Sequence, residues 1–157
     1  MKKILMCIYV ILFMCFETVD SPYVNAKSVD IKPTVGTITI EKINLNRQFH
    51  KEGNVDKEIV MLDSDFPDLE NSLLVLAAHS GTGPFSFFNY LYKLQLKDVI
   101  KITYDNKTYN YKIIYIYQVP KNGKAEIYKI NNKRTLVLIT CTNNVKDKQT
   151  IYVAVEY

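Results

Sequence analysis

The 157-residue sequence contains no Trp and has only two His, three Cys and two Arg. A structural zinc site usually takes four Cys and His ligands at short spacings, and we exclude one because no pair of these residues has such a spacing. A disulfide framework is excluded as well, since Cys7 and Cys15 lie in an apolar N-terminal stretch and leave Cys141 as the one Cys in the rest of the chain. The Lys residues form no basic block, so the net charge of +4 does not indicate a nucleic-acid-binding protein.

The chain is rich instead in residues that favour strands, among them 12 Tyr together with many Ile, Val and Thr. Hydrophobic residues make up 48% and charged residues 23% of the sequence, a balance typical of a folded protein. At this length we expect a single domain with a sizeable core.

Residues 1–26 are predicted to be a signal peptide or an N-terminal membrane anchor. Lys2 and Lys3 precede thirteen consecutive apolar residues at positions 4–16. A run of this length fits the apolar core of a signal peptide, about 7–15 residues, and is short for a membrane-spanning helix, which needs about 20. Residues 24–26 (VNA) suit cleavage by signal peptidase, and without cleavage the apolar run would act as a short anchor.

Both alternatives export the remainder of the chain. We therefore expect an extracytoplasmic protein that is associated with the cell membrane, or that is secreted if residues 1–26 are removed. Residues 27–34 are predicted to be a linker and residues 35–157 a single folded domain, because no repeat or further linker divides them.

The pattern of apolar residues predicts an all-β domain. Residues 73–78 and 135–140 are almost wholly apolar, which indicates strands buried on both faces. Residues 85–96 are the one segment with helical spacing, which places Phe88 and Leu91 on one face. About eight strands with so little helix predict a sandwich or a closed barrel. The expected strands are residues 36–40, 43–46, 58–62, 73–78, 99–104, 108–119, 135–140 and 150–156.

The two apolar strands each deliver a reactive side chain. His79 directly follows one strand and Cys141 the other, 62 positions later. A lone Cys and a His in an exported domain are a candidate nucleophile pair, because a nearby imidazolium favours the thiolate and can protonate a leaving amine. Taken singly, Cys141 could be a small core residue, and His79 could bond a carbonyl in its Gly-rich turn. His50, beside Lys51 in a polar turn, is expected to be solvated and is given no role.

Two motifs resemble those of the sortases. Residues 76–83 (LAAHSGTG), followed by 88–91 (FNYL), are similar to the family's histidine motif, and residues 136–142 (LVLITCT) are similar to its TLxTC motif. Residues 36–43 (GTITIEKI) resemble its first strand. The resemblance runs from about Gly36 to the end of the chain.

This resemblance implies an eight-stranded sortase-type β-barrel with one or two short helices, in which residues 35–157 form the catalytic domain. It implies a membrane-associated cysteine transpeptidase that cleaves a C-terminal LPxTG-like sorting signal of secreted proteins. The protein would be held as an acyl-thioester and passed to a peptidoglycan precursor or a pilin amine. Cys141 would be the nucleophile and His79 the general acid and base, and this chemistry requires no metal or organic cofactor. The implied substrate-binding residues are Thr140, Ala125, Ile127 and Tyr128; alternatively, the last three anchor their loop to the barrel.

The sequence departs from the family at one position. Sortases carry an Arg on the last strand, after the Cys, that steadies the substrate and the oxyanion. Here neither Arg of the sequence follows Cys141. The alignment puts Gln149 in the Arg place, and a shift of one residue would put Thr150 there. A Gln amide donates a hydrogen bond to an oxyanion but brings no charge. Arg134 lies seven residues before Cys141, about 23 Å at the rise of a strand, and is too far away to substitute.

Three functional hypotheses remain. The first is an active sortase-type transpeptidase. The second is a non-catalytic or impaired sortase-like domain that binds peptides, motivated by Gln149. The third, a cysteine transpeptidase acting on peptidoglycan crosslinks, is disfavoured because such enzymes usually place His and Cys within one motif.

Overall fold

A computed structural model describes residues 34–157 apart from 63 and 123. The predicted signal peptide or anchor at 1–26, and all of the predicted linker except Thr34, lie outside the described residues. The described residues fall in one compact unit. None of the helical segments among them has the length and apolar character needed to cross a bilayer.

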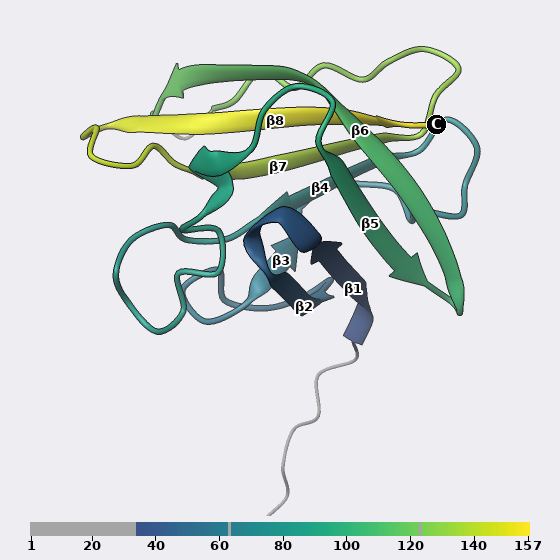
Figure 1. Ribbon diagram of the computed structural model, residues 1–157, viewed down its shortest axis with the longest axis horizontal. Coiled ribbons are helices and arrows are strands. Elements are labelled where there is room, and N and C mark those ends of the chain that lie inside the picture. Colours follow the sequence, from purple (N-terminus) through teal and green to yellow (C-terminus); the bar gives the residue numbers. More distant parts are fainter. Residues whose placement is uncertain (1–33, 63, 123) are drawn as a thin grey trace, which may run out of the picture. The chain divides into compact units, whose positions relative to one another are not determined.

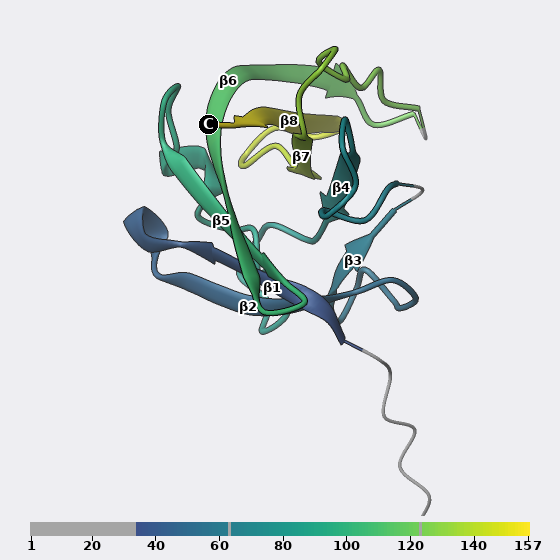
Figure 2. The same ribbon diagram turned by 90° about the vertical axis from the view of Figure 1, so that its right-hand side faces the viewer.

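Eight strands close into a barrel, which confirms the predicted all-β class. Around the barrel the strands follow the order β1-β2-β3-β4-β7-β8-β6-β5, and Figure 2 shows this ring from one end. The pairs β2–β3 and β4–β7 are parallel, and the other neighbours are antiparallel. The elements are β1 (Thr34–Ile40), η1 (Glu41–Ile43), β2 (Leu45–His50), β3 (Ile59–Met61), β4 (Leu73–Ala77), η2 (Leu91–Lys93), β5 (Val99–Tyr104), β6 (Lys107–Pro120), β7 (Thr135–Cys141) and β8 (Lys148–Glu156).

Strands β4 and β7 are buried on both faces, as their apolar sequences predict. Their inner side chains, such as Leu76 and Leu138, belong to the core that fills the barrel. Their outer side chains belong to a second cluster, which we call the outer cluster: Val75, Ala77, Val137, Ile139, Ile151 and Val153. Because loops before β3 and before β7 cover this cluster, β4 and β7 lie at fixed positions between two packed layers.

Two local predictions were wrong. The predicted helix at 85–96 is a series of turns that ends in the three-residue 3-10 helix η2. Phe88 and Leu91 are buried as expected, but Phe88 N–H donates to the backbone carbonyl of His79 instead of continuing a helix. The second strand begins at Leu45, later than predicted, because Glu41–Ile43 form η1 and Asn44 takes a left-handed conformation with φ 52°.

Gly36 in β1 fills a position where the barrel leaves no room for a side chain. A Cβ there would stand 2.5 Å from the carbonyl oxygen of Thr103 and 2.8 Å from the ring of Phe49. We expect Gly36→Ala to lower the free energy of unfolding by about 1–3 kcal/mol, since the strands must shift to admit the methyl group. Urea unfolding measures the loss. Gly83→Ala is the control, because its Cβ would meet no atom closer than 3.6 Å, and equal midpoints for the two variants would contradict the prediction.

Candidate active site

Three side chains lie in one row across the outer face of the sheet, and the β4–β7 register leads His79 towards the same row. In the β7–β8 pair, Cys141 lies opposite Gln149, and in the β8–β6 pair Gln149 lies opposite Val119. The parallel β4–β7 register pairs Ala77 with Ile139, and His79 and Cys141 each lie two residues beyond this pair in the same chain direction. Directly paired residues present their side chains to the same face of a sheet. The register therefore brings the two residues that the sequence singles out to the same end of the sheet, at the end of β7 opposite the C-terminus marked in Figure 1.

Hydrogen bonds continue the pairing of β4 and β7 beyond the end of β4. Ala78 N–H donates to the carbonyl of Ile139 at 3.3 Å, and the Thr140 hydroxyl donates to the carbonyl of Ala78 at 2.9 Å. The Ser80 hydroxyl donates to the carbonyl of Cys141 at 2.7 Å. These bonds fix the backbone on both sides of the His79 and Cys141 positions, which is what a site needs to hold its reacting groups in place.

His79 is paired with a carboxylate. Its Nε2 lies 2.6 Å from Oδ1 of Asp56, in the loop between β2 and β3. The hydrogen bond from His79 lowers the pKa of Asp56 below its ordinary value of 3.8, so the carboxylate is ionised at neutral pH and accepts the Nε2 proton. In the neutral imidazole this leaves Nδ1 free of a proton and able to accept one from a thiol. Asn54 shapes the loop through its side-chain oxygen, which accepts from Asp56 N–H at 2.9 Å, and Val55 packs against the outer cluster.

Cys141 has a cationic neighbour that the sequence analysis missed. Nζ of Lys121 lies 3.5 Å from Sγ of Cys141, within hydrogen-bond range for sulfur. Lys121 directly follows β6 and lies two residues beyond Val119, so the alternation of the strand puts both on the same face. The Cys141 side chain is partly exposed, so reactants in solution can reach it.

The structure places Gln149 and Thr150, the two residues considered for the Arg position, on opposite faces of the sheet. Gln149 is the direct partner of Cys141 and shares its face, whereas Thr150 pairs with Thr140 and bonds the Thr142 hydroxyl at 2.9 Å on the other face. The oxyanion role of Gln149 stays a prediction.

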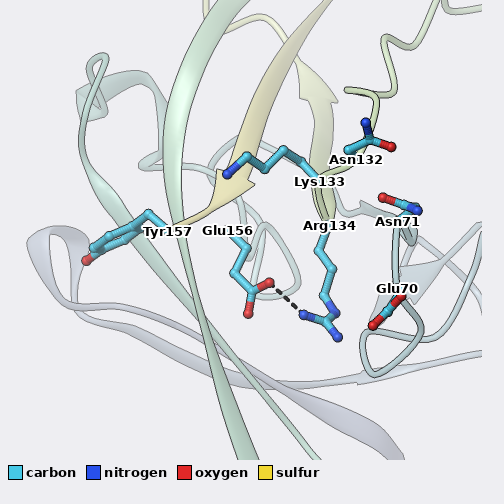
Figure 3. A pocket seen from close by; sticks show the side chains of 7 residues that line it. All are labelled: Glu70, Asn71, Asn132, Lys133, Arg134, Glu156 and Tyr157. Atoms are coloured by element: carbon cyan, nitrogen blue, oxygen red, sulfur yellow. Dashed lines mark hydrogen bonds and ion pairs between the residues drawn. The ribbon is translucent and has the colours of Figure 1, made fainter.

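Arg134 is engaged at the far end of β7. Its Nη1 donates to Glu156 at 2.7 Å, and its other nitrogens donate to the carbonyls of Asp68 and Leu69. Figure 3 shows this ion pair in a polar cavity bordered by both side chains. The cavity therefore lies away from the row that contains Cys141.

The predicted substrate contacts in the loop between β6 and β7 have defined neighbours. Ala125 and Ile127 pack against the outer cluster, which corresponds to the anchoring alternative. Tyr128 is half exposed and packs edge-on against the ring of Tyr117, whose hydroxyl donates to the carbonyl of Glu126. Contact of these side chains with a substrate stays a prediction.

A cavity of about 590 Å³ lies at the same strand ends. Cys141 and Thr140 border it, together with Phe88 from the turn segment and Tyr152 from β8. Burial raises the pKa of Tyr152 to about 12, so its phenol is neutral at physiological pH. Across the described part of the chain, no group of three or more His, Cys, Asp or Glu side chains is placed to hold a metal ion.

A cysteine and a histidine at adjacent strand ends of a closed barrel, each with a charged neighbour, define a site suited to thiol-dependent acyl transfer. The model of the sortase domain matches residues 38–156, and the chain belongs to the sortase family. A search of curated protein sequences gives no significant match.

Solved sortase structures share the fold. Sortase C1 from Streptococcus agalactiae is 23% identical with a TM-score of 0.73, and the match covers 83% of this chain and 70% of that one. A lid mutant of sortase A from Corynebacterium diphtheriae is 21% identical with a TM-score of 0.72, covering 81% and 72%. The sortase D5 transpeptidase of Clostridium perfringens is 24% identical with a TM-score of 0.68, covering 79% of each chain. These likenesses confirm the predicted sortase-type barrel.

Proposed function

We propose that this protein is an active sortase-type cysteine transpeptidase, with Cys141 as nucleophile and His79 as general acid and base. The observation that carries the proposal is the register of the parallel strands β4 and β7, in which His79 and Cys141 each lie two residues beyond the Ala77–Ile139 pair, with Asp56 on the imidazole and Lys121 on the thiol. Membership of the sortase family supports the class of reaction.

The first half of the reaction forms an acyl-enzyme. The Cys141 thiolate attacks the Thr carbonyl carbon of an LPxTG-like sorting signal, and a C–S bond forms. The C–N bond to Gly breaks as the His79 imidazolium gives its proton to the leaving amine. The enzyme then holds a thioester and a neutral His79.

The second half transfers the acyl group. A cell-wall or pilin amine attacks the thioester carbon, a C–N bond forms and the C–S bond breaks. His79 takes the proton from the attacking amine, which restores the thiolate and the imidazolium. We propose that the protein works outside the cytoplasm at the cell membrane, or as a secreted protein if residues 1–26 are removed.

A panel of quenched LPxTG-type peptides tests the proposal. The protein is incubated with each peptide, with and without an acceptor amine such as triglycine. We expect cleavage of at least one peptide, formation of the amine-exchanged product, and a mass increase on Cys141 equal to the acyl fragment. Failure of every peptide to be cleaved, together with no adduct on Cys141, would overturn the proposal.

The uncharged side chain opposite Cys141 favours a second candidate, an impaired sortase-like domain that binds extended peptides. If the absence of an Arg at position 149 limits the rate, Gln149→Arg should raise peptide cleavage by about 10²-fold or more, the cost of a lost oxyanion donor. A rate that stays the same or falls, in a protein that already cleaves well, removes the basis of this candidate.

The Asp56–His79 pair gives a smaller predicted effect on catalysis. Asp56→Asn keeps an oxygen near Nε2 but removes the charge that pairs with the imidazole, so we expect kcat/KM to fall about two- to fivefold, as for other exposed ion pairs. Because the pKa of Asp56 is lowered, the carboxylate contributes at all pH values above its ordinary 3.8 and is lost only as the pH falls through the lowered value. Peptide-cleavage rates between pH 5 and about 9 measure the effect. Glu52→Gln, in the same exposed loop, is the control, and an equal loss in both variants would contradict the prediction.

A further inference from the structure

We propose that Lys121 supplies the positive charge of this active site, holding Cys141 as a thiolate and stabilising the oxyanion that forms on the substrate. The inference rests on the proposed function and goes beyond it, because no motif in the sequence assigns a cation to Cys141. The observation that carries it is the 3.5 Å contact between Nζ of Lys121 and Sγ of Cys141.

The backbone holds Lys121 at this point of the barrel. Pro120 ends β6 paired with Lys148 of β8, and the next residue, Lys121, donates its N–H to the carbonyl of Asp147 at 2.8 Å. Strand alternation then directs Lys121 to the face that carries Cys141 and Gln149. The pairing of β6 with β8 thus places the Lys121 backbone near Cys141, and its flexible side chain extends from there to the sulfur.

A lysine at this position can act on both charged species of the reaction. An ammonium near a thiol favours the thiolate, which is the attacking form. The negative charge later lies on the oxygen of the carbon atom that Sγ attacks, so an ammonium beside the sulfur lies close to the oxyanion. Lys121 gives up no proton in either step and stays charged throughout.

Two residues would then divide the tasks that a single guanidinium performs. An Arg provides a permanent charge together with directed N–H donors. Here Gln149 lies directly opposite Cys141 and offers an amide donor, while Lys121, the residue after β6, offers the charge. The arrangement accounts for a site that keeps the Cys and His motifs without an Arg after Cys141.

The test compares four variants of the full chain. Lys121→Met removes the charge, Lys121→Arg keeps it, and Lys121→Met combined with Gln149→Arg moves it to the neighbouring strand. Lys148→Met is the matched control, because Lys148 is adjacent to Gln149 in β8 and so faces the other side of the sheet. Each protein is assayed for peptide cleavage and for the pH dependence of Cys141 alkylation by iodoacetamide, followed by mass spectrometry.

We expect Lys121→Met to lower kcat/KM about 10- to 100-fold and to slow the alkylation of Cys141 relative to the wild type. Lys121→Arg and the double variant should recover most of both losses, and Lys148→Met should match the wild type. Among the described residues, the groups that contacts or register place around Cys141 are His79 with its partner Asp56, neutral Gln149, and Lys121. A change of Lys121 therefore alters one charge and leaves the imidazole pair in place.

Two results would overturn the inference: a Lys121→Met protein with the wild-type rate and alkylation profile, or equal losses in Lys121→Met and Lys148→Met. Failure of the proposed function gives a different pattern. In that case the wild type cleaves no peptide, while the alkylation profiles still report whether Lys121 acts on the Cys141 thiol.

Discussion

Replacing Cys141 by Ala is expected to abolish both peptide cleavage and the covalent adduct, a loss of more than about 10⁴-fold in kcat/KM. The proposed reaction passes through a thioester on this sulfur, and its strand neighbours offer no substitute: Gln149 is a poor nucleophile, and Val119 has no reactive atom. Peptide cleavage followed to long times, with intact-protein mass spectrometry, measures the loss.

The loss should be separable from misfolding. Cys141 lies at the end of β7 and is partly exposed, so its truncation leaves no enclosed cavity and the thermal unfolding midpoint should stay close to that of the wild type. Cys7→Ala with Cys15→Ala is the matched control, since the sequence assigns these two residues no chemical role. Residual cleavage by Cys141→Ala at more than about 1% of the wild-type rate would mean that another residue acts as the nucleophile.

The sequence predicts the centre of the site because its signal is local. A strand buried on both faces must be apolar along its whole length. A reactive residue stands at or just after the end of both such strands: His79 lies two residues beyond β4, and Cys141 is the last residue of β7. Parallel pairing of β4 with β7 then brings the two strand ends together. That pairing is a property of the barrel, and the family resemblance predicts it where periodicity alone does not.

The partners of these two residues could not be predicted in the same way. Asp56 is one of several acidic residues in polar loops, and what distinguishes it is the packing of Val55 on the outer cluster. Lys121 is one of many lysines, and what distinguishes it is the pairing of β6 with β8, which joins segments about thirty residues apart. The one feature of the sequence that helps to locate Lys121 is Pro120, which is the last residue of β6 and directly precedes it.

The helix predicted at residues 85–96 was wrong for a different reason: the local spacing indicates a helix, but the surrounding structure imposes turns. Phe88 and Leu91 have the spacing of a helix and are buried, but Gly83 and Pro84 precede them in a turn. The side-chain oxygen of Asn89 accepts a hydrogen bond from Gly81 N–H at 3.1 Å. Turns therefore bring the two apolar side chains into the core without a helix, and the same turns fix the backbone that follows His79.

His79→Gln should lower kcat/KM by about 10²- to 10⁴-fold, the usual contribution of a general acid and base. Gln offers an amide N–H in place of the Nε2–H that Asp56 accepts, but it cannot carry a proton to the leaving amine.

Adding Asp56→Asn to His79→Gln should lower kcat/KM no further, because Asp56 acts through the imidazole. This lack of additivity would distinguish a positioning residue from an independent one. His50→Gln is the control, since this second His at the end of β2 is given no role. A His79→Gln protein that retains more than about a tenth of the wild-type rate would show that the proton reaches the leaving amine by another route, and the assignment of His79 would then be wrong.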